Sequence, residues 1–151
     1  MSEIESLSKI HISIVTYNSE RYIDKLIESL LRQTVSANRL KITFLDNSSS
    51  DTSVKKLQLN ADKFKASGIK FELIESSENL GFGRAHNRVF QDSNSDYFLI
   101  LNPDCIMTPD ALSILLKSAQ ESMSEYAAFE PRQLPFAVSY THLTLPTICS
   151  V

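Results

Sequence analysis

The sequence predicts an α/β fold with a mostly parallel sheet and helices on both of its faces. Four short apolar segments alternate with four segments of helical periodicity, which is the order of a layered α/β domain with right-handed crossovers. A polar cluster follows each apolar segment, as expected where parallel strands end at one edge. The chain has 151 residues, of which 42% are hydrophobic and 22% charged, so one domain with its own core is expected.

The expected strands are short runs of β-branched and apolar residues. In the first of them, Ile10, Ile12 and Ile14 alternate with polar residues, which is the period of a strand. The last is a continuous apolar run that is too short to span a membrane and has the length of a buried strand. We expect the four strands at residues 9–16, 40–45, 69–74 and 96–101.

The expected helices carry apolar stripes in which residues recur at intervals of three and four. Asn18 or Ser19 is the expected cap of the first helix. Ser50 or Asp51 is the expected cap of the second, and Gly68 closes it. We expect the four helices at about residues 19–34, 51–68, 81–92 and 109–119.

The fourth strand delivers a carboxylate to the edge where ligands bind in open α/β sheets. It is followed by Asn102, Pro103 and Asp104. Pro103 cannot continue the ladder, because it has no N–H and a fixed φ, so Asp104 lies at the carboxyl edge. A hard carboxylate there suits a divalent cation that also contacts a substrate phosphate. The plainer interpretation is a strand followed by a polar turn.

Polar clusters after all four strands predict one lined cleft, because the carboxyl ends of parallel strands share an edge. The candidate substrate-binding residues in these clusters are Thr16, Asn18, Asp46, Asn47, Asn79, Gly81, Gly83, Arg84, Asn87 and Asn102, and the candidate metal ligand is Asp104. Their types suit a nucleotide. Thr16 and Asn18 offer donors and acceptors to a planar polar group, and Asp46 can accept hydrogen bonds from a base N–H or a ribose hydroxyl.

The turn before the third helix suits a phosphate group. Gly81 and Gly83 allow the backbone to approach a ligand closely, and the N-terminus of the following helix favours an anion. Arg84 or His86 would add positive charge beside that phosphate. The plainer alternatives stay open: both glycines serve the turn alone, Arg84 is a solvated charge and His86 is structural.

Composition argues against several classes of protein. The formal net charge of −3 does not suit a nucleic-acid-binding face. No apolar run reaches the length of roughly 18 residues that a transmembrane helix needs. Residues 1–5 are acidic and unlike a signal peptide, and two cysteines do not form a disulfide framework. We expect a cytoplasmic protein, and peripheral association with the inner face of the membrane stays open.

The end of the sequence differs from the rest. No Asp, Glu, Lys or Arg follows Arg132, and residues 137–151 are rich in Thr, Val, Leu and Ile without a helical stripe. This segment resembles a translated sequencing-adapter read-through. We therefore expect a domain at residues 1–136 that is truncated there, and a non-native tail at residues 137–151. The alternative is a native β-strand at the C-terminus.

Five segments resemble, in their order and spacing, the motifs of family 2 glycosyltransferases: IVTYN, SLLRQT, FLDNSSSDTS, NLGFGRAHN and LILNPDC. The bacterial rhamnosyltransferase-like members are the most similar. The resemblance covers residues 9–136 and implies the N-terminal, nucleotide-sugar-binding half of a GT-A fold, which is Rossmann-like. It also implies a donor of the dTDP-rhamnose or UDP-sugar type, Mg²⁺ or Mn²⁺, inversion at the anomeric carbon, and a glycan or lipid-linked acceptor in polysaccharide biosynthesis at the cell envelope.

The resemblance assigns residues as well. Thr16, Asn18 and Asp46 would contact the nucleoside, and Asp104 the metal. Many members of the family have Asp-x-Asp where this chain has Asn102-Pro103-Asp104, which leaves one carboxylate in place of two.

The catalytic base has no candidate in the sequence. In the family it is an acidic residue of the second half, and no Asp or Glu follows Glu130 here. We therefore expect binding of the donor sugar without turnover by these residues alone. A dinucleotide-binding oxidoreductase is the weaker alternative, since residues 81–86 half-match G-x-G-x-x-G but follow the third strand, whereas that fingerprint belongs after the first.

Overall fold

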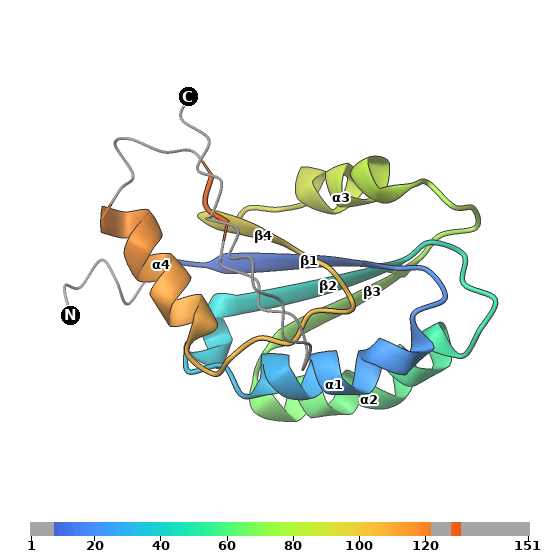
Figure 1. Cartoon of the computed structure of the whole chain (residues 1–151), viewed down its shortest axis with the longest axis horizontal. Coiled ribbons are helices and arrows are strands. Elements are labelled where there is room, and N and C mark those ends of the chain that lie inside the picture. Colours follow the sequence, from blue (N-terminus) through green and yellow to red (C-terminus); the bar gives the residue numbers. More distant parts are fainter. Residues whose placement is uncertain (1–7, 122–127, 131–151) are drawn as a thin grey trace, which may run out of the picture. The chain divides into compact units, whose positions relative to one another are not determined.

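Strands and helices alternate along the chain as the sequence predicts. The computed structural model describes residues 8–121 and 128–130 (Figure 1). Residues 137–151, and the domain boundary expected at 136, lie outside the described residues. The elements are β1 (Ile10–Thr16), α1 (Glu20–Leu31), a 3-10 turn η1 (Ala37–Arg39), β2 (Leu40–Asp46), α2 (Ser53–Ser67), β3 (Lys70–Glu75), α3 (Phe82–Gln91), β4 (Tyr97–Leu101) and α4 (Ala111–Glu121).

The four strands form one parallel sheet in the order β3-β2-β1-β4. Ile10 of β1 pairs with Leu40 on one side and with Tyr97 on the other. The chain therefore builds outward from β1 through β2 to β3 and then returns to the opposite side of β1. This reversal is a topological switch point, and ligands of open α/β sheets bind beyond the carboxyl ends of the strands at such a point.

Helices cover both faces of the sheet, as predicted: α1 and α2 lie on one face and α3 on the other (Figure 1). The first face is apolar, with Ile12, Ile14, Ile42 and Phe44 fully buried. The ring of Phe64 in α2 stacks on Phe71 of β3 at 4.9 Å between centroids. On the other face, α3 packs through Ala85 and Val89 against Leu45. The helix α4 belongs to a second unit that begins at residue 111, and its buried stripe is Leu112, Leu116 and Ala119.

The face of the sheet that α3 covers carries buried polar side chains. His11 and Thr43 are fully buried, and His11 Nε2 lies 2.8 Å from Thr43 Oγ1. Thr43 Oγ1 donates its only hydrogen to Glu72 Oε2 at 3.0 Å, so it accepts its other hydrogen bond from the Nε2–H of His11. Glu72 is paired with Lys41 at 2.9 Å. Burial lowers the pKa of His11 to about 4, and the Lys41 ammonium adds to that effect.

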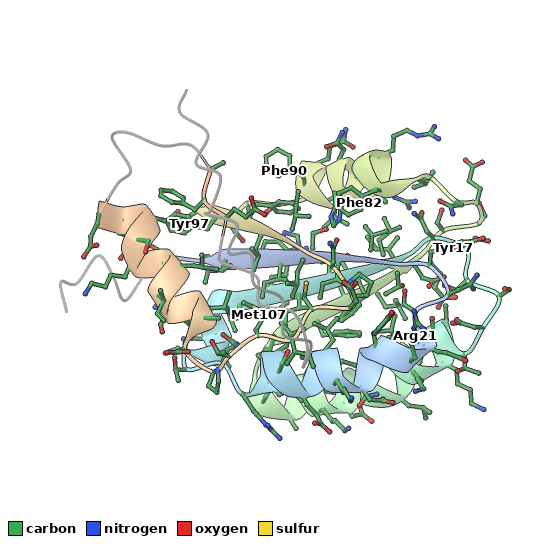
Figure 2. All side chains as sticks on the ribbon, viewed as in Figure 1. Tyr17, Arg21, Phe82, Phe90, Tyr97 and Met107 are labelled. Carbon is green, nitrogen blue, oxygen red and sulfur yellow. The ribbon has the colours of Figure 1, made fainter. Side chains whose placement is uncertain are left out.

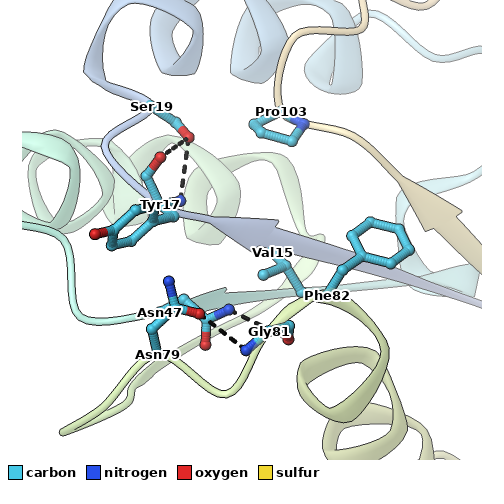
Figure 3. A pocket seen from close by; sticks show the side chains of 8 residues that line it. All are labelled: Val15, Tyr17, Ser19, Asn47, Asn79, Gly81, Phe82 and Pro103. Atoms are coloured by element: carbon cyan, nitrogen blue, oxygen red, sulfur yellow. Dashed lines mark hydrogen bonds between the residues drawn. The ribbon is translucent and has the colours of Figure 1, made fainter.

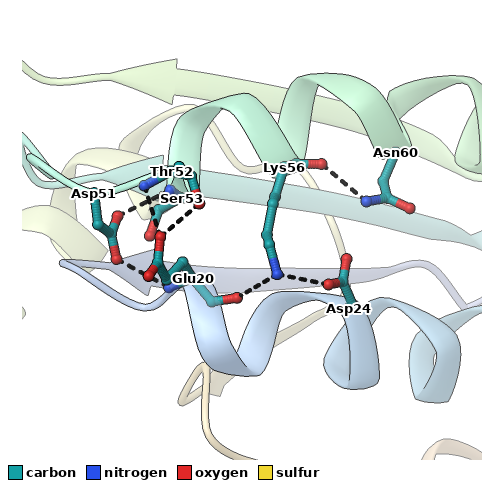
Figure 4. A network of polar contacts seen from close by, with 7 residues as sticks. All are labelled: Glu20, Asp24, Asp51, Thr52, Ser53, Lys56 and Asn60. Carbon is teal, nitrogen blue, oxygen red and sulfur yellow. Dashed lines mark hydrogen bonds and ion pairs between the residues drawn. The ribbon is translucent and has the colours of Figure 1, made fainter.

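The N-termini of α1 and α2 cap one another (Figure 4). The backbone N–H of Glu20, the first residue of α1, donates to Asp51 Oδ2 at 3.1 Å, and Ser53 N–H donates to Asp51 Oδ1 at 2.8 Å. In return, Thr52 N–H donates to Glu20 Oε2 at 3.0 Å. Ser19 stands at the N-cap position of α1, as expected, but its side chain makes no capping hydrogen bond, and the acceptor for the N–H of Glu20 comes from the loop before α2. In α2 the N-cap position falls to Thr52, one residue after the expected Asp51, but the Asp51 carboxylate still accepts the first N–H of the helix.

Substitution Asp51→Ala tests this reciprocal cap. The change leaves backbone donors of two helices without acceptors, and we expect it to lower the free energy of unfolding by about 2 kcal/mol, roughly two caps at the usual cost of one each. Although partial burial alone would raise the pKa of Asp51, hydrogen bonds from Ser53 and Glu20 lower it, so the cap is strongest at neutral pH. Urea denaturation measures the change. Asp62→Ala, at an exposed position of α2, is the control and should change stability by less than about 0.5 kcal/mol.

Candidate functional site

A pocket of about 360 Å³ opens at the carboxyl edge of the sheet, beside the switch point (Figure 3). The ends of β1, β2 and β4 and the turn before α3 all contribute to it. Its lining residues are Val15, Tyr17, Ser19, Asn47, Asn79, Gly81, Phe82 and Pro103. The topology thus brings the four polar clusters of the sequence to one edge, and each of the four contributes at least one lining residue.

Asp46 ends β2 and is held by its neighbours. Its side chain is almost fully buried, and its Oδ1 accepts hydrogen bonds from Thr16 Oγ1 at 2.9 Å and from Ser49 Oγ at 2.6 Å. Its Oδ2 accepts the N–H of Ser49 at 2.8 Å and has room for a second donor. Thr16 is fully buried, and it pairs with Asp46 in the sheet register. Thr16 therefore orients the Asp46 carboxylate and does not itself reach the pocket surface.

Asn18 joins the loop after β1 to the loop after β2. It adopts a φ of +49°, a left-handed conformation that asparagine tolerates better than most residues. Its N–H donates to Ser49 Oγ at 2.9 Å, and its Oδ1 accepts the N–H of Ser50 at 2.9 Å. No hydrogen bond of its Nδ2 group is found within residues 8–121, so Asn18 keeps two donors for a ligand.

Asn47 clamps the turn that precedes α3. Its Oδ1 accepts the N–H of Leu80 at 3.1 Å, and its Nδ2 donates to the carbonyl oxygen of Gly81 at 3.4 Å. Asn79 Oδ1 accepts the N–H of Gly81 at 2.9 Å (Figure 3). Gly81 has φ +75° and ψ 170°, a conformation that essentially only glycine adopts. A Cβ at Gly83 would meet nothing within 4 Å and its φ is ordinary, so only Gly81 is needed for the turn.

Two exposed aromatic residues line the pocket, and sequence reasoning did not select them. Tyr17 is 54% exposed at the end of β1, and Phe82 is 56% exposed at the start of α3 (Figure 2). Large aromatic side chains that remain exposed beside a pocket offer ring faces for stacking. In the sequence, these two residues are marked by their position within the polar clusters that follow the strands. The other lining residues that the sequence did not predict are Val15, Ser19 and Pro103.

Of the ten candidate substrate-binding residues, three line the pocket, namely Asn47, Asn79 and Gly81, and the other seven and Asp104 lie outside the lining. Arg84 is exposed, and its Nε donates to the carbonyl oxygen of Leu80 at 2.9 Å, so its charge lies at the turn before α3. Asn87, Asn102 and Asp104 are exposed as well.

His86 does not supply positive charge to a ligand. It is 3% exposed, and its Nδ1 lies 2.8 Å from Ser13 Oγ in the interior. Burial lowers the pKa of His86, so the ring is neutral at physiological pH. The structural alternative for His86 therefore fits the geometry, and Arg84 is the residue of the pair that can face an anion.

Asp104 offers one carboxylate to a metal. It follows Pro103, which lines the pocket, and Cys105 Sγ lies 4.0 Å from its Oδ1. Among residues 8–121 and 128–130, no group of three His, Cys, Asp or Glu side chains gathers to form a metal site made of protein alone. Mg²⁺ is commonly held by one or two carboxylates together with substrate phosphates, so a single exposed carboxylate next to the pocket would fit such an ion where a phosphate also ligates it.

Comparison with known proteins identifies the family. The model of Glycosyl transferase family 2 matches residues 11–133. The chain belongs to this family. The match covers the sheet, the pocket and the four polar clusters, so the family resemblance drawn from the five sequence segments is confirmed.

Two relatives align with about three quarters of this chain. Teichoic acid poly(glycerol phosphate) polymerase of Staphylococcus epidermidis is 31% identical over 111 residues, which are 74% of this chain and 15% of that protein. Chondroitin synthase of Escherichia coli is 29% identical over 115 residues, which are 76% of this chain and 16% of that protein. The chain therefore spans about one sixth of these relatives.

Solved structures share the GT-A-like fold. S. aureus TarS 1–349, solved in complex with UDP, superposes with a TM-score of 0.67 at 21% identity, over 76% of this chain and 33% of that one. The mannosyltransferase PcManGT from Pyrobaculum calidifontis, solved with GDP-Man and Mn²⁺, superposes with a TM-score of 0.62 at 18% identity, over 66% of this chain and 28% of that one. The part of the chain that the structure describes contains no helix long and apolar enough to cross a bilayer.

Proposed function

We propose that the pocket binds the nucleotide of a nucleoside-diphosphate sugar, and that the chain serves transfer of this sugar to a glycan or lipid-linked acceptor. One observation carries the proposal: the ends of three strands and the turn before α3 converge on one pocket at the switch point of the sheet. Nucleotide ligands of open α/β sheets bind at this place. Family membership supports sugar transfer as the reaction.

Different residues in and next to the pocket lining would contact different parts of the nucleotide. Tyr17, in the lining, would offer a ring face to the nucleobase, and Asn18 and Asp46, which adjoin the lining residues Tyr17 and Asn47 in the sequence, would offer hydrogen-bonding groups to the edge of the nucleobase and to the ribose. Val15, Phe82 and Pro103 form a more apolar side of the pocket. The donor in this proposal is of the dTDP-rhamnose or UDP-sugar type. The structures of TarS with UDP-GlcNAc and of PcManGT with GDP-Man support a sugar nucleotide as the class of ligand.

The diphosphate would lie towards Asp104 and the turn before α3. Asp104 would hold Mg²⁺ or Mn²⁺ that the diphosphate also ligates. Such an ion would neutralise the charge of the departing diphosphate. Arg84 adds a positive charge at the same turn, and its place is held by its bond to Leu80.

This proposal assigns no residue as the catalytic base, the group that takes the proton from the acceptor hydroxyl. Inverting transfer needs a base, because the acceptor hydroxyl must lose its proton as it attacks the sugar carbon. None of the described residues that line the pocket is an acid or a histidine. Binding without turnover by these 151 residues therefore stays a prediction. Action at the inner face of the membrane, where lipid-linked acceptors lie, is also part of the proposal.

Isothermal titration calorimetry of the full chain tests the proposal. We expect UDP and dTDP to bind in the presence of MnCl₂, UDP-GlcNAc to bind without release of free sugar, and NAD⁺ not to bind. Binding of NAD⁺ with no binding of the nucleoside diphosphates would contradict the proposal. Release or transfer of sugar would leave donor binding intact and contradict the expected lack of turnover.

A further inference from the structure

Two buried hydroxyl–imidazole pairs lie on the α3 face of the sheet. In one, His11 contacts Thr43 at 2.8 Å, and in the other, His86 contacts Ser13 at 2.8 Å. The two pairs have the same chemistry and nearly the same burial, with exposed fractions of 0–3%. They differ in the aromatic ring that each imidazole contacts, which is Phe82 for His86 and Phe98 for His11.

The Ser13–His86 pair supports a wall of the pocket. The ring of Phe82, which lines the pocket, meets the imidazole of His86 edge-on, with 4.5 Å between centroids and an angle of 70°. His86 itself is not part of the lining. Phe82 thus has one side against a buried ring, while 56% of its surface stays exposed.

The orientation of the His86 ring depends on Ser13. Among the described residues, His86 Nε2 has no hydrogen-bond partner, so the bond between Nδ1 and Ser13 Oγ is the only polar contact that orients the imidazole. The backbone of Phe82 is fixed separately, because Asn47 and Asn79 hold Gly81 directly before it. The direction of the Phe82 ring is a separate matter, and the His86 imidazole is the aromatic ring on which it packs edge-on.

We propose that Ser13 and His86 are positioning residues for Phe82, and that Phe82 contacts the bound donor nucleotide and sets its affinity. The proposal rests on the proposed function, because it takes the pocket to be the donor site. Neither Ser13 nor His86 touches the ligand. Their effect passes through the aromatic ring, which keeps its exposed face towards the pocket.

The His11–Thr43 pair provides the matched control. It also joins a buried hydroxyl to a buried imidazole, but its aromatic neighbour is Phe98 of β4, which does not line the pocket. Substitution Thr43→Val removes the hydroxyl while preserving the shape of the side chain. Ser13→Ala does the same for the other pair. Ser13→Ala removes one buried hydrogen bond, whereas Thr43→Val removes two, to His11 and to Glu72, so Thr43→Val should destabilise the chain at least as much.

The test measures the affinity of the full chain for UDP in MnCl₂ by calorimetry, and stability by urea denaturation, for Ser13→Ala, Thr43→Val, Phe82→Ala and the double variant Ser13→Ala/Phe82→Ala. We expect Phe82→Ala to weaken binding about tenfold, the scale of one lost stacking contact. Ser13→Ala should weaken it about threefold, part of the worth of one hydrogen bond. The double variant should bind as Phe82→Ala does, and Thr43→Val as the native chain does.

A second measurement needs no ligand. In ¹⁵N–¹H spectra, Ser13→Ala should shift the amide resonances of Phe82 and Gly83, and Thr43→Val should leave them in place. If these resonances do not respond to Ser13→Ala, positioning is contradicted whatever the nucleotide does. Equal weakening of UDP binding by Ser13→Ala and Thr43→Val, or additive effects of Ser13→Ala and Phe82→Ala, would also overturn it. If the native chain binds no nucleotide while the resonances respond as expected, positioning stands and the donor contact of Phe82 fails together with the proposed function.

Discussion

Substitution Asp104→Asn is expected to remove the metal-dependent part of nucleotide binding. Asparagine keeps the size of the side chain and takes away the charge that holds a divalent cation. Even changes beside a metal ligand cost about 10- to 100-fold in metal affinity, so we expect UDP affinity in MnCl₂ to fall by at least about tenfold. Affinity measured in EDTA should be the same for both proteins. Calorimetry in the two buffers measures the effect.

Asp92→Asn is the matched control for this substitution. Asp92 is also exposed, and it lies at the end of α3, away from the turn that enters the pocket. We expect this variant to bind UDP as the native chain does in both buffers. An Asp104→Asn protein that keeps the full enhancement by Mn²⁺ would remove Asp104 from the proposed metal site.

Lowering the pH is expected to destabilise the folded chain already between pH 6.5 and 5, which lies above the range in which aspartate and glutamate ordinarily titrate. Burial, with a contribution from Lys41, lowers the pKa of His11 from 6.5 to about 4. As the pH falls below 6.5, the unfolded chain gains a proton at His11 that the folded chain does not bind. We expect the free energy of unfolding to fall by about 2 kcal/mol between pH 6.5 and 5, and by about 3 kcal/mol at pH 4. The lowered pKa of His86 acts in the same direction.

Urea denaturation at a series of pH values measures this loss of stability. The window from pH 6.5 to 5 lies above the ordinary titration of aspartate and glutamate, so histidine dominates there. The variant His11→Gln removes one titrating group, and its stability should depend less steeply on pH in this window, whatever its stability at pH 7. A slope equal to that of the native chain would show that His11 is not buried as a neutral group.

Local patterns in the sequence were enough to predict the architecture. The alternation of Ile10, Ile12 and Ile14 marks β1, and helical stripes mark α1 to α4. Gly68 closes α2 with a φ of +80°, which its lack of a Cβ allows. The pocket's place at the carboxyl edge also follows from sequence order, since alternating strands and helices with parallel pairing leave few arrangements.

Local sequence patterns do not encode the contacts between residues that lie far apart in the chain. The acceptor for the first N–H of α1 comes from Asp51, which is 31 residues away, so no local cap rule points to it. Thr16 and Asp46 lie side by side through the sheet register, and their mutual hydrogen bond turns Thr16 away from the pocket surface. Residue type marks the polar candidates in the sequence, whereas exposure in the folded chain marks Tyr17 and Phe82. Exposure depends on packing by the whole fold.

The proposed function requires that a nucleoside diphosphate binds at the carboxyl edge of the sheet, between β1 and β4. Titration of the ¹⁵N-labelled full chain with UDP and MgCl₂, followed by ¹⁵N–¹H NMR, tests it most directly. We predict that the largest amide shifts fall at residues 17–19, 46–49 and 79–83 and at Asp104. Shifts confined to the opposite edge of the sheet, around Lys41 and Lys70, or no shifts at all, would contradict such binding.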